Sequence, residues 1–295
     1  MTTLGDVITD VQRRLRSYTG QHEQSTHLTA SVSADASALS VADGGAVTSG
    51  LVQVDDELIW VSATTGGSLV VPPYGRGYAG STAAEHAADA QVVVDPFYPR
   101  VDIAQAIRDA ALALYPRLFR VQTATFEFSP AVSTYDLAAD ADRVLDVSAE
   151  TVGPSGAWLR VRRYGVDQNA DTSVYASGRS ITLGQAVDAG RTVRVTYASR
   201  FGTLDTADDE LTDAGFSESH RDVLTLGTVY RLVQFLEPAR LNLTAVANQE
   251  RSQYSPVGAA SALTRQLLGL YEQRIGEERG LLLQSWPVRP VRTSR

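Results

Sequence analysis

The stretch of this sequence that most resembles a chemical motif is glycine-rich and runs from Gly75 to Gly80. Its G-x-G-x-x-G spacing is that of the loop that holds a dinucleotide pyrophosphate, and Asp95 follows where such proteins carry an acid for the ribose. Three features oppose this interpretation: residues 72–74 separate the preceding strand from Gly75, the next helix has room for about ten residues, and no second βαβ half follows. We therefore expect a glycine-rich loop in a β module, in which Gly75, Gly77 and Gly80 bind no dinucleotide.

The remaining reactive side chains form no recognisable catalytic or metal site. The histidines are scattered without metal-binding spacing, and the run from Asp205 to Glu210 has Ala207 where a calcium loop needs an oxygen ligand. Residues 55–57, Asp-Asp-Glu, lie between two short apolar runs, which predicts a hairpin turn rather than paired catalytic carboxylates. The chain has no cysteine and no lysine, which excludes disulfides, thiolate and Schiff-base nucleophiles and the P-loop lysine. We expect no enzyme, no cofactor and no metal.

Composition and charge narrow the class of protein further. The 295 residues are 43% hydrophobic, which is ordinary for a packed protein of one large domain or two to three small modules. No run approaches the ~20 apolar residues of a membrane span, so we expect no membrane contact. The net charge is −8, which argues against a nucleic-acid binder. The charge is uneven, because residues 205–222 carry seven acids against one arginine, whereas residues 155–200 have a net charge of +4.

Apolar periodicity separates helical from β segments. Residues 1–20 have an apolar stripe typical of a helix, with Thr2 or Thr3 available as N-cap. Residues 101–119 have a second such stripe, and Pro116 should kink or tighten the last turn of that helix. Further helices are predicted over 218–236, 239–254 and 259–283. Short alternating runs in the two intervening regions predict strands. The end of the chain, from Trp286, is too rich in proline for a helix.

The predicted fold class is therefore α+β: a helical bundle core assembled from separated segments, with two inserted small β modules and an extended C-terminal arm. We expect the segments to pack as one bundle because each has an apolar stripe that it cannot bury alone. The boundaries are 1–20, 98–120 and 205–285 for the bundle, 21–97 and 121–204 for the β modules, and 286–295 for the arm.

Two stretches together resemble a known family. Residues 76–86, RGYAGSTAAEH, resemble an RG-x-x-GT-x-A-x-x-H segment of small β modules in phage structural proteins. The run 104–119, followed by YDLA at 135–138, VLDV at 144–147 and GTVYRL at 227–232, is similar in layout to head-to-tail adaptor (connector, neck) proteins of tailed bacteriophages. The likeness covers about two-thirds of the chain, and the β module at 21–97 is larger than a minimal adaptor requires.

The resemblance implies a structural protein of the virion neck, assembled in the host cytoplasm. It implies a homo-oligomeric ring, commonly of twelve subunits, which contacts the portal protein and a stopper or tail protein and passes double-stranded DNA without sequence-specific binding. The C-terminal arm would then dock into the portal through Trp286, Arg289, Pro290, Arg292 and Arg295. An acidic loop formed by Asp205, Asp208, Asp209 and Glu210 is a candidate for the channel lining, because acidic groups repel phosphate.

Two other functions stay open at this point. A tail-side neck, stopper or baseplate protein would also suit β modules that meet other rings. An enzyme, either nucleotide-dependent through residues 75–80 or active on carbohydrate, is the alternative from a different class.

Overall fold

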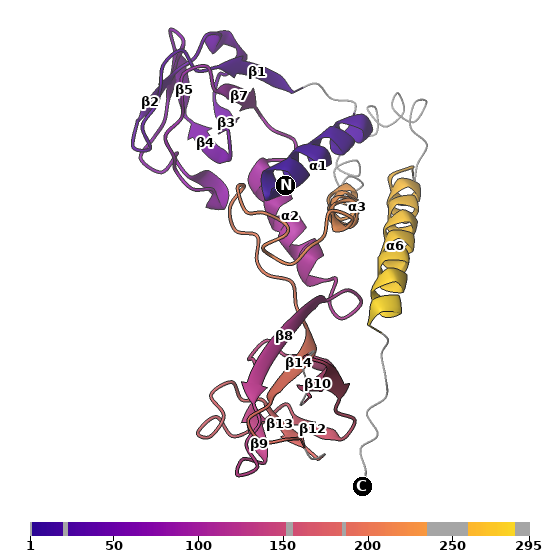
Figure 1. The fold of residues 1–295 in the computed structure, drawn as a ribbon. Coiled ribbons are helices and arrows are strands. Elements are labelled where there is room, and N and C mark those ends of the chain that lie inside the picture. The colour runs from indigo at the N-terminus through magenta and orange to yellow at the C-terminus, as the bar shows by residue number, and fades with distance from the viewer. Residues whose placement is uncertain (1, 20–22, 152–155, 185–186, 235–258, 287–295) are drawn as a thin grey trace.

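The protein is described here from a computed structural model, which places residues 2–19, 23–151, 156–184, 187–234 and 259–286. Within these ranges the chain forms four α-helices and four small antiparallel sheets, which confirms the expected mixture of helices and strands. Two β modules lie at opposite ends of the molecule with the helices between them (Figure 1). No helix in the described part of the chain is long and apolar enough to cross a membrane.

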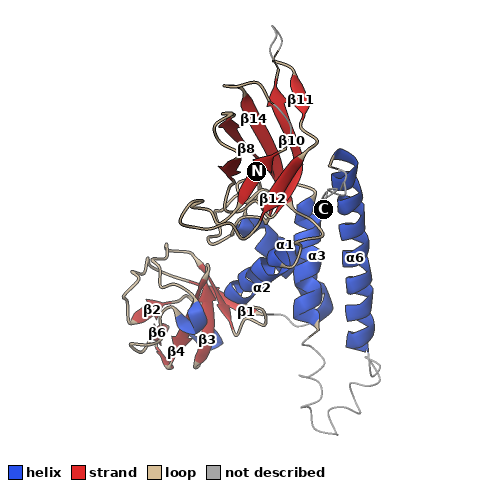
Figure 2. Cartoon of the chain, turned by 90° about the horizontal axis from the view of Figure 1, so that it is seen from below, coloured by secondary structure: helices blue, strands red, loops and turns tan. Residues whose placement is uncertain are grey.

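The helices come from distant parts of the sequence and share one hydrophobic core. They are α1 (Leu4–Thr19), α2 (Arg100–Leu112), α3 (His220–Val233) and α6 (Ala259–Ser285). α3 lies at the centre and packs against each of the other three, and α6 runs alongside it in both views (Figures 1 and 2). The core includes fully buried residues such as Val7 and Val11 of α1 and Val223 of α3, together with Tyr271 of α6. Each helix thus buries the apolar stripe that it could not bury alone.

The N-terminal end of α1 is capped as its sequence predicts. The Thr3 hydroxyl accepts a hydrogen bond from the Asp6 amide at 3.3 Å, and the Asp6 carboxylate accepts one from the Thr3 amide at 2.9 Å. This reciprocal pair satisfies two amides that the helix leaves without partners. The bond from the Thr3 backbone is the main cause that lowers the pKa of Asp6.

The first β module, residues 23–97, consists of two sheets around a core of aliphatic residues. One sheet has the order β1-β7-β3-β4 and the other β2-β6-β5. The strands are β1 (Gln24–His27), β2 (Ala38–Ser40), β3 (Gly50–Val54), β4 (Glu57–Val61), β5 (Ala63–Thr65), β6 (Ser68–Val70) and β7 (Gln91–Val94). Asp55 and Asp56 form the β3–β4 turn, as the flanking apolar runs predicted.

The second β module, residues 120–200, also has two sheets and a separate core. Its sheets have the orders β11-β10-β14-β8 and β12-β13-β9. The strands are β8 (Arg120–Glu127), β9 (Thr134–Asp136), β10 (Arg143–Glu150), β11 (Trp158–Arg160), β12 (Tyr164–Asp167), β13 (Ser180–Leu183) and β14 (Thr192–Ser199). Trp158 lies under the Arg194 guanidinium, which is 4.2 Å from the ring centroid.

The ends of two helices differ from those that the apolar periodicity predicted. α2 ends at Leu112 rather than near Phe119, and turns occupy residues 113–117 because Pro116 has no amide proton to continue the helix. Residues 205–219 contain turns at 207–208, 211–215 and 218–219 but no helix, so the helix predicted over 218–236 begins only at His220. The helix predicted over 239–254 lies outside the described residues.

Candidate functional site

The acidic loop, residues 205–210, holds the N-terminus of α1 against the rest of the bundle. Its main chain accepts the first amides of the helix: Leu4 donates to the Asp209 carbonyl at 2.9 Å and Gly5 to the Ala207 carbonyl at 2.8 Å. From α2, the Arg108 guanidinium donates to the carbonyl of Asp205 at 2.7 Å. These contacts join α1 and α2 through one loop, so part of the loop's role is structural.

The four predicted acids of this loop therefore have different surroundings. Asp209 accepts hydrogen bonds from the Asp205 amide at 2.6 Å, the Thr206 amide at 3.0 Å and the Thr206 hydroxyl at 2.6 Å. These bonds, from the Thr206 hydroxyl above all, lower the pKa of Asp209. Asp205 and Asp208 are exposed, whereas Glu210 is half-buried beside the α1 N-terminus. A cluster of three or more acidic or histidine residues fit to hold a metal ion is absent from the described ranges.

The predicted C-terminal arm is described only at its first residue. The Trp286 amide donates to the Leu282 carbonyl at 2.8 Å, which is the hydrogen bond of a last helical turn. Trp286 is therefore bonded to the last turn of α6 rather than beginning an extended segment. The other predicted docking residues, Arg289, Pro290, Arg292 and Arg295, lie outside the described residues.

The glycine-rich stretch surrounds a buried carboxylate that sequence reasoning missed. Glu57, at the start of β4, has a side chain 1% exposed and accepts two bonds from the Arg76 guanidinium, both 2.8 Å long. The amides of Gly77 and Ala84 and the Nε2 atom of His86 contribute three more contacts, of 2.9, 3.0 and 2.9 Å. These five contacts lower the pKa of Glu57 to about 2, although burial acts in the opposite direction. We call Glu57 and its four partners, Arg76, Gly77, Ala84 and His86, the Glu57 network.

Two glycines of the stretch have structural roles, because one donates its amide to the Glu57 network and the other allows a close backbone contact. Gly77 has a φ of 56°, in the left-handed region that favours glycine, and its amide points at Glu57. Gly75 lies so close to β4 that a Cβ atom there would be 2.6 Å from the Trp60 carbonyl oxygen. After Gly80 the chain runs on without a helix to Ala90, whereas a dinucleotide loop opens a helix. The stretch is thus shaped by packing within the module.

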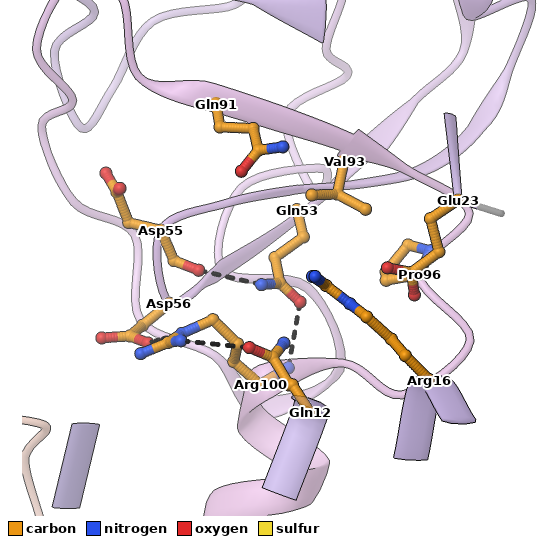
Figure 3. Close-up of a pocket in the computed structure, with 10 residues that line it drawn as sticks. All are labelled: Gln12, Arg16, Glu23, Gln53, Asp55, Asp56, Gln91, Val93, Pro96 and Arg100. Carbon is orange, nitrogen blue, oxygen red and sulfur yellow. Dashed lines mark hydrogen bonds and ion pairs between the residues drawn. The ribbon is translucent and has the colours of Figure 1, made fainter. Parts of the chain in front are cut away.

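A polar hollow of about 390 Å³ lies where the first β module meets the helices (Figure 3). Arg100, the first residue of α2, crosses it: its backbone amide donates to Gln53 at 2.9 Å, and its side chain pairs with Asp56 at 2.5 Å. The Arg16 side chain extends from α1 over the same space, and Asp55 borders it from the β3–β4 turn (Figure 3). The hollow is a hydrogen-bonded joint between two bodies, with acids on the side of the β module and arginines on the side of the helices.

Comparison with known proteins identifies the chain. A family model described as the SU10 adaptor protein matches residues 81–277, about two-thirds of the sequence. No curated protein matches. The match covers α2, the second β module, α3 and most of α6, but leaves out α1 and most of the first β module. The chain belongs to the SU10 adaptor family and is a phage head-to-tail adaptor, a structural protein rather than an enzyme.

Proposed function

We propose that copies of this adaptor form a closed ring between portal and tail, in the neck of the virion, and that the genome passes through the ring. The observation that carries the proposal is the family match over α2, the second β module, α3 and most of α6. A joint that lets a DNA duplex through must surround it, and repeated contacts between identical subunits close such a ring by rotation. By resemblance to other adaptors we expect twelve subunits.

The acidic loop is the candidate lining of the channel. The exposed side chains of Asp205 and Asp208 support this role, while Asp209 is committed to its own turn. A ring multiplies the net charge of −8 per chain, and a surface of that sign repels phosphate groups. DNA would then slide through the channel without sequence-specific binding.

The C-terminal end is the candidate contact to the portal. Trp286, the residue directly after α6, has a half-buried side chain, and Arg289, Arg292 and Arg295 follow in the sequence with no acid among them. Prolines restrict the chain before it binds, and arginines suit an acidic groove on a neighbouring ring. Removal of residues 287–295 should leave the melting temperature nearly unchanged while abolishing attachment to the portal. Normal portal binding by the truncated chain would exclude the arm and favour a helix face.

Electron microscopy and mass measurement of the purified chain, alone and with a portal protein, test the ring itself. We expect ring-shaped particles with a central hole whose mass is a multiple of 31.7 kDa, and a heavier particle when the portal protein is added. Rings that bind a tail protein but not the portal would place the chain on the tail side, as a stopper. A monomer in both mixtures would refute the ring.

A further inference from the structure

Strand β8 forms an open edge of the larger sheet in the second β module (Figure 2). β14 pairs with one side of β8, and no strand in the described part of the chain pairs with the other side. The Phe128 amide, directly after β8, donates to the Arg191 carbonyl at 2.8 Å, on the β14 side. Hydrogen bonding alternates along an antiparallel strand, so the backbone amides and carbonyls of Thr123, Thr125 and Glu127 point to the open side.

This edge lacks the proline, bulge or central charge that usually keeps an exposed strand from pairing with another chain. β8 has eight residues in unbroken register with β14, and residues 121–126 include no charge and no proline. In the first β module, by contrast, edge strand β4 is covered: the Trp60 amide donates to the Gly75 carbonyl at 2.8 Å, and the Leu58 amide to the Ser81 hydroxyl at 2.9 Å. A long uncharged edge such as that of β8 is a template for a further strand.

The opposite edge of the same sheet, β11, exposes backbone groups and an apolar side chain. The Val161 amide, directly after β11, donates to the Val147 carbonyl of β10 at 2.8 Å. By the same alternation, the backbone groups of Trp158 and Arg160 point away from β10. Leu159 is 66% exposed, although it lies on the same face of the sheet as the buried Val161.

We propose that β11 of one copy pairs with β8 of the next copy, so that the sheet continues from subunit to subunit around the ring. This inference rests on the ring proposed above and assigns the surface that closes it. Neighbouring strands alternate in direction across all four positions of the sheet, so the next β11 meets β8 antiparallel, like every other pair. β8 and β11 are different surfaces, and a contact between different surfaces repeats from copy to copy and closes a ring by rotation.

The apolar face of the sheet continues across this contact. Leu159 lies opposite Ala149, Ala149 opposite Val193, and Val193 opposite Phe126, which makes one apolar row from β11 to β8. The row ends at an exposed leucine on one edge and at the half-buried Phe126 on the other. A second copy seated on β8 brings its own Leu159 to the face that carries Phe126, so the row extends into the next subunit and the leucine leaves water.

The polar face of the sheet matches in charge. Thr125 and Arg160, whose backbone groups point to the open edges, both lie on this face, so pairing them keeps polar side chains with polar ones. Glu127 is the charged residue of β8 on this face, and Arg160 is that of β11. Opposite charges on neighbouring strands attract, whereas a contact between two β11 edges would bring two arginines together.

Edge variants of the full-length chain, alone and with a portal protein, test the contact. Thr125→Pro removes an amide that points to the open edge and keeps the bonds to β14, so its melting temperature should stay near that of the wild type while ring particles are lost. Leu159→Glu places a charge against the neighbouring Phe126 and should also abolish rings. Val174→Glu is the matched control, since Val174 is 67% exposed in a loop of the same module, and it should leave the rings intact.

Cross-linking identifies the two strands directly. The chain has no cysteine, so single cysteines can be placed at will. Thr125→Cys and Arg160→Cys chains, mixed and assembled, should give a cross-linked dimer with a short bis-maleimide, and neither variant alone should give one. A dimer from Thr125→Cys alone would show that two β8 strands pair with each other and would overturn the proposal.

The outcomes distinguish this contact from the ring itself. A wild-type chain that stays monomeric in both mixtures overturns the ring and the contact together. Wild-type rings, with equally abundant rings from Leu159→Glu, overturn the contact and leave the ring standing. If Thr125→Pro does not fold, Leu159→Glu and the cross-link decide.

Discussion

The Glu57 network offers the sharpest test of how the first β module is held together. In Glu57→Gln the side chain keeps its shape but loses its charge, and its amide nitrogen replaces one oxygen acceptor. At one position that nitrogen faces Arg76 Nε and the Gly77 amide, and at the other it faces Arg76 Nη2 together with the Ala84 amide and His86 Nε2, because both carboxylate oxygens are occupied. The substitution therefore places a donor against a donor in a buried site, whichever way the amide is turned.

Two estimates of the cost agree. Breaking a buried ion pair by removing one charge typically destabilises by about 3–5 kcal/mol. A fall in the pKa of Glu57 from 4.5 to about 2 corresponds to about 3 kcal/mol of stabilisation of the charged form. The module is small and its core is separate from that of the helices, so a loss of this size should unfold most of its residues locally.

Hydrogen exchange measured by peptide gives the local stability of each body. We expect exchange in residues 24–94 to accelerate about a hundredfold or more in Glu57→Gln, while α3 and β14 keep their wild-type protection. Glu85→Gln is the matched control, since Glu85 is exposed one residue before His86, and it should change little. Unchanged protection of β3 and β4 in Glu57→Gln would refute the reasoning.

The same network predicts how the module responds to acid. Because the folded-state pKa of Glu57 lies below its unfolded value, its stabilisation is fully present above pH 4.5 and is lost as the pH falls toward about 2. Module protection should therefore decline over that interval in the wild type and be less dependent on pH in Glu57→Gln. An equally steep decline in the variant would show that another group carries the acid sensitivity.

Three further predictions concern the helical core. Asp209→Ala removes three hydrogen bonds from the acidic loop and should loosen the N-terminal end of α1, seen as faster amide exchange in residues 4–15, whereas Asp208→Ala should leave that exchange unchanged. Leu15→Ala empties a site that is 1% exposed and should cost about 2–5 kcal/mol in urea unfolding of the helices; a smaller loss would mean that Leu15 is not part of their core. Burial lowers the pKa of His220 below its usual 6.5, so the helices should lose stability as the pH falls below 6.5. In His220→Gln the stability of the helices should depend less on pH in that range. An equally steep dependence in the variant would refute the role of His220.

The helical core was the more predictable part of the fold. Spacings of three and four residues mark the buried positions of α1, where Leu4, Val7, Val11 and Leu15 are all at most 1% exposed. The spacing also marks α6, whose buried Leu267, which is 3% exposed, lies on the predicted stripe. Apolar periodicity does not show where a turn ends a helix. The predicted end of α2 at Phe119 is therefore seven residues beyond its end in the structure, at Leu112.

The Glu57 network was not predicted because the sequence patterns around its residues indicate other structures. Asp55, Asp56 and Glu57 together resemble a solvated turn, and only the position of Glu57 two and four residues before the buried Ile59 and Val61 places the third acid on an inward face. The glycine spacing at 75–80 points to nucleotide chemistry, although its glycines instead allow a close backbone contact and an amide aimed at Glu57. One signal was present: Arg76 is the sole basic residue other than histidine between residues 21 and 97. A lone arginine in an acidic module is a candidate partner for a buried acid.

The three cores explain why these effects should stay local. Among the residues that the structure describes, none is shared between the core of the helices and the cores of the two modules. The first module meets the helices through polar contacts such as Arg100 with Asp56. The second contacts the connector that follows α2 through arginines over aromatic rings, with Arg143 4.8 Å from the centroid of Phe119 and Arg200 5.3 Å from that of Tyr115. Such joints bury little apolar surface, so unfolding one body removes few contacts from its neighbour. A substitution that melts the first module should therefore spare the helices on which the family match rests.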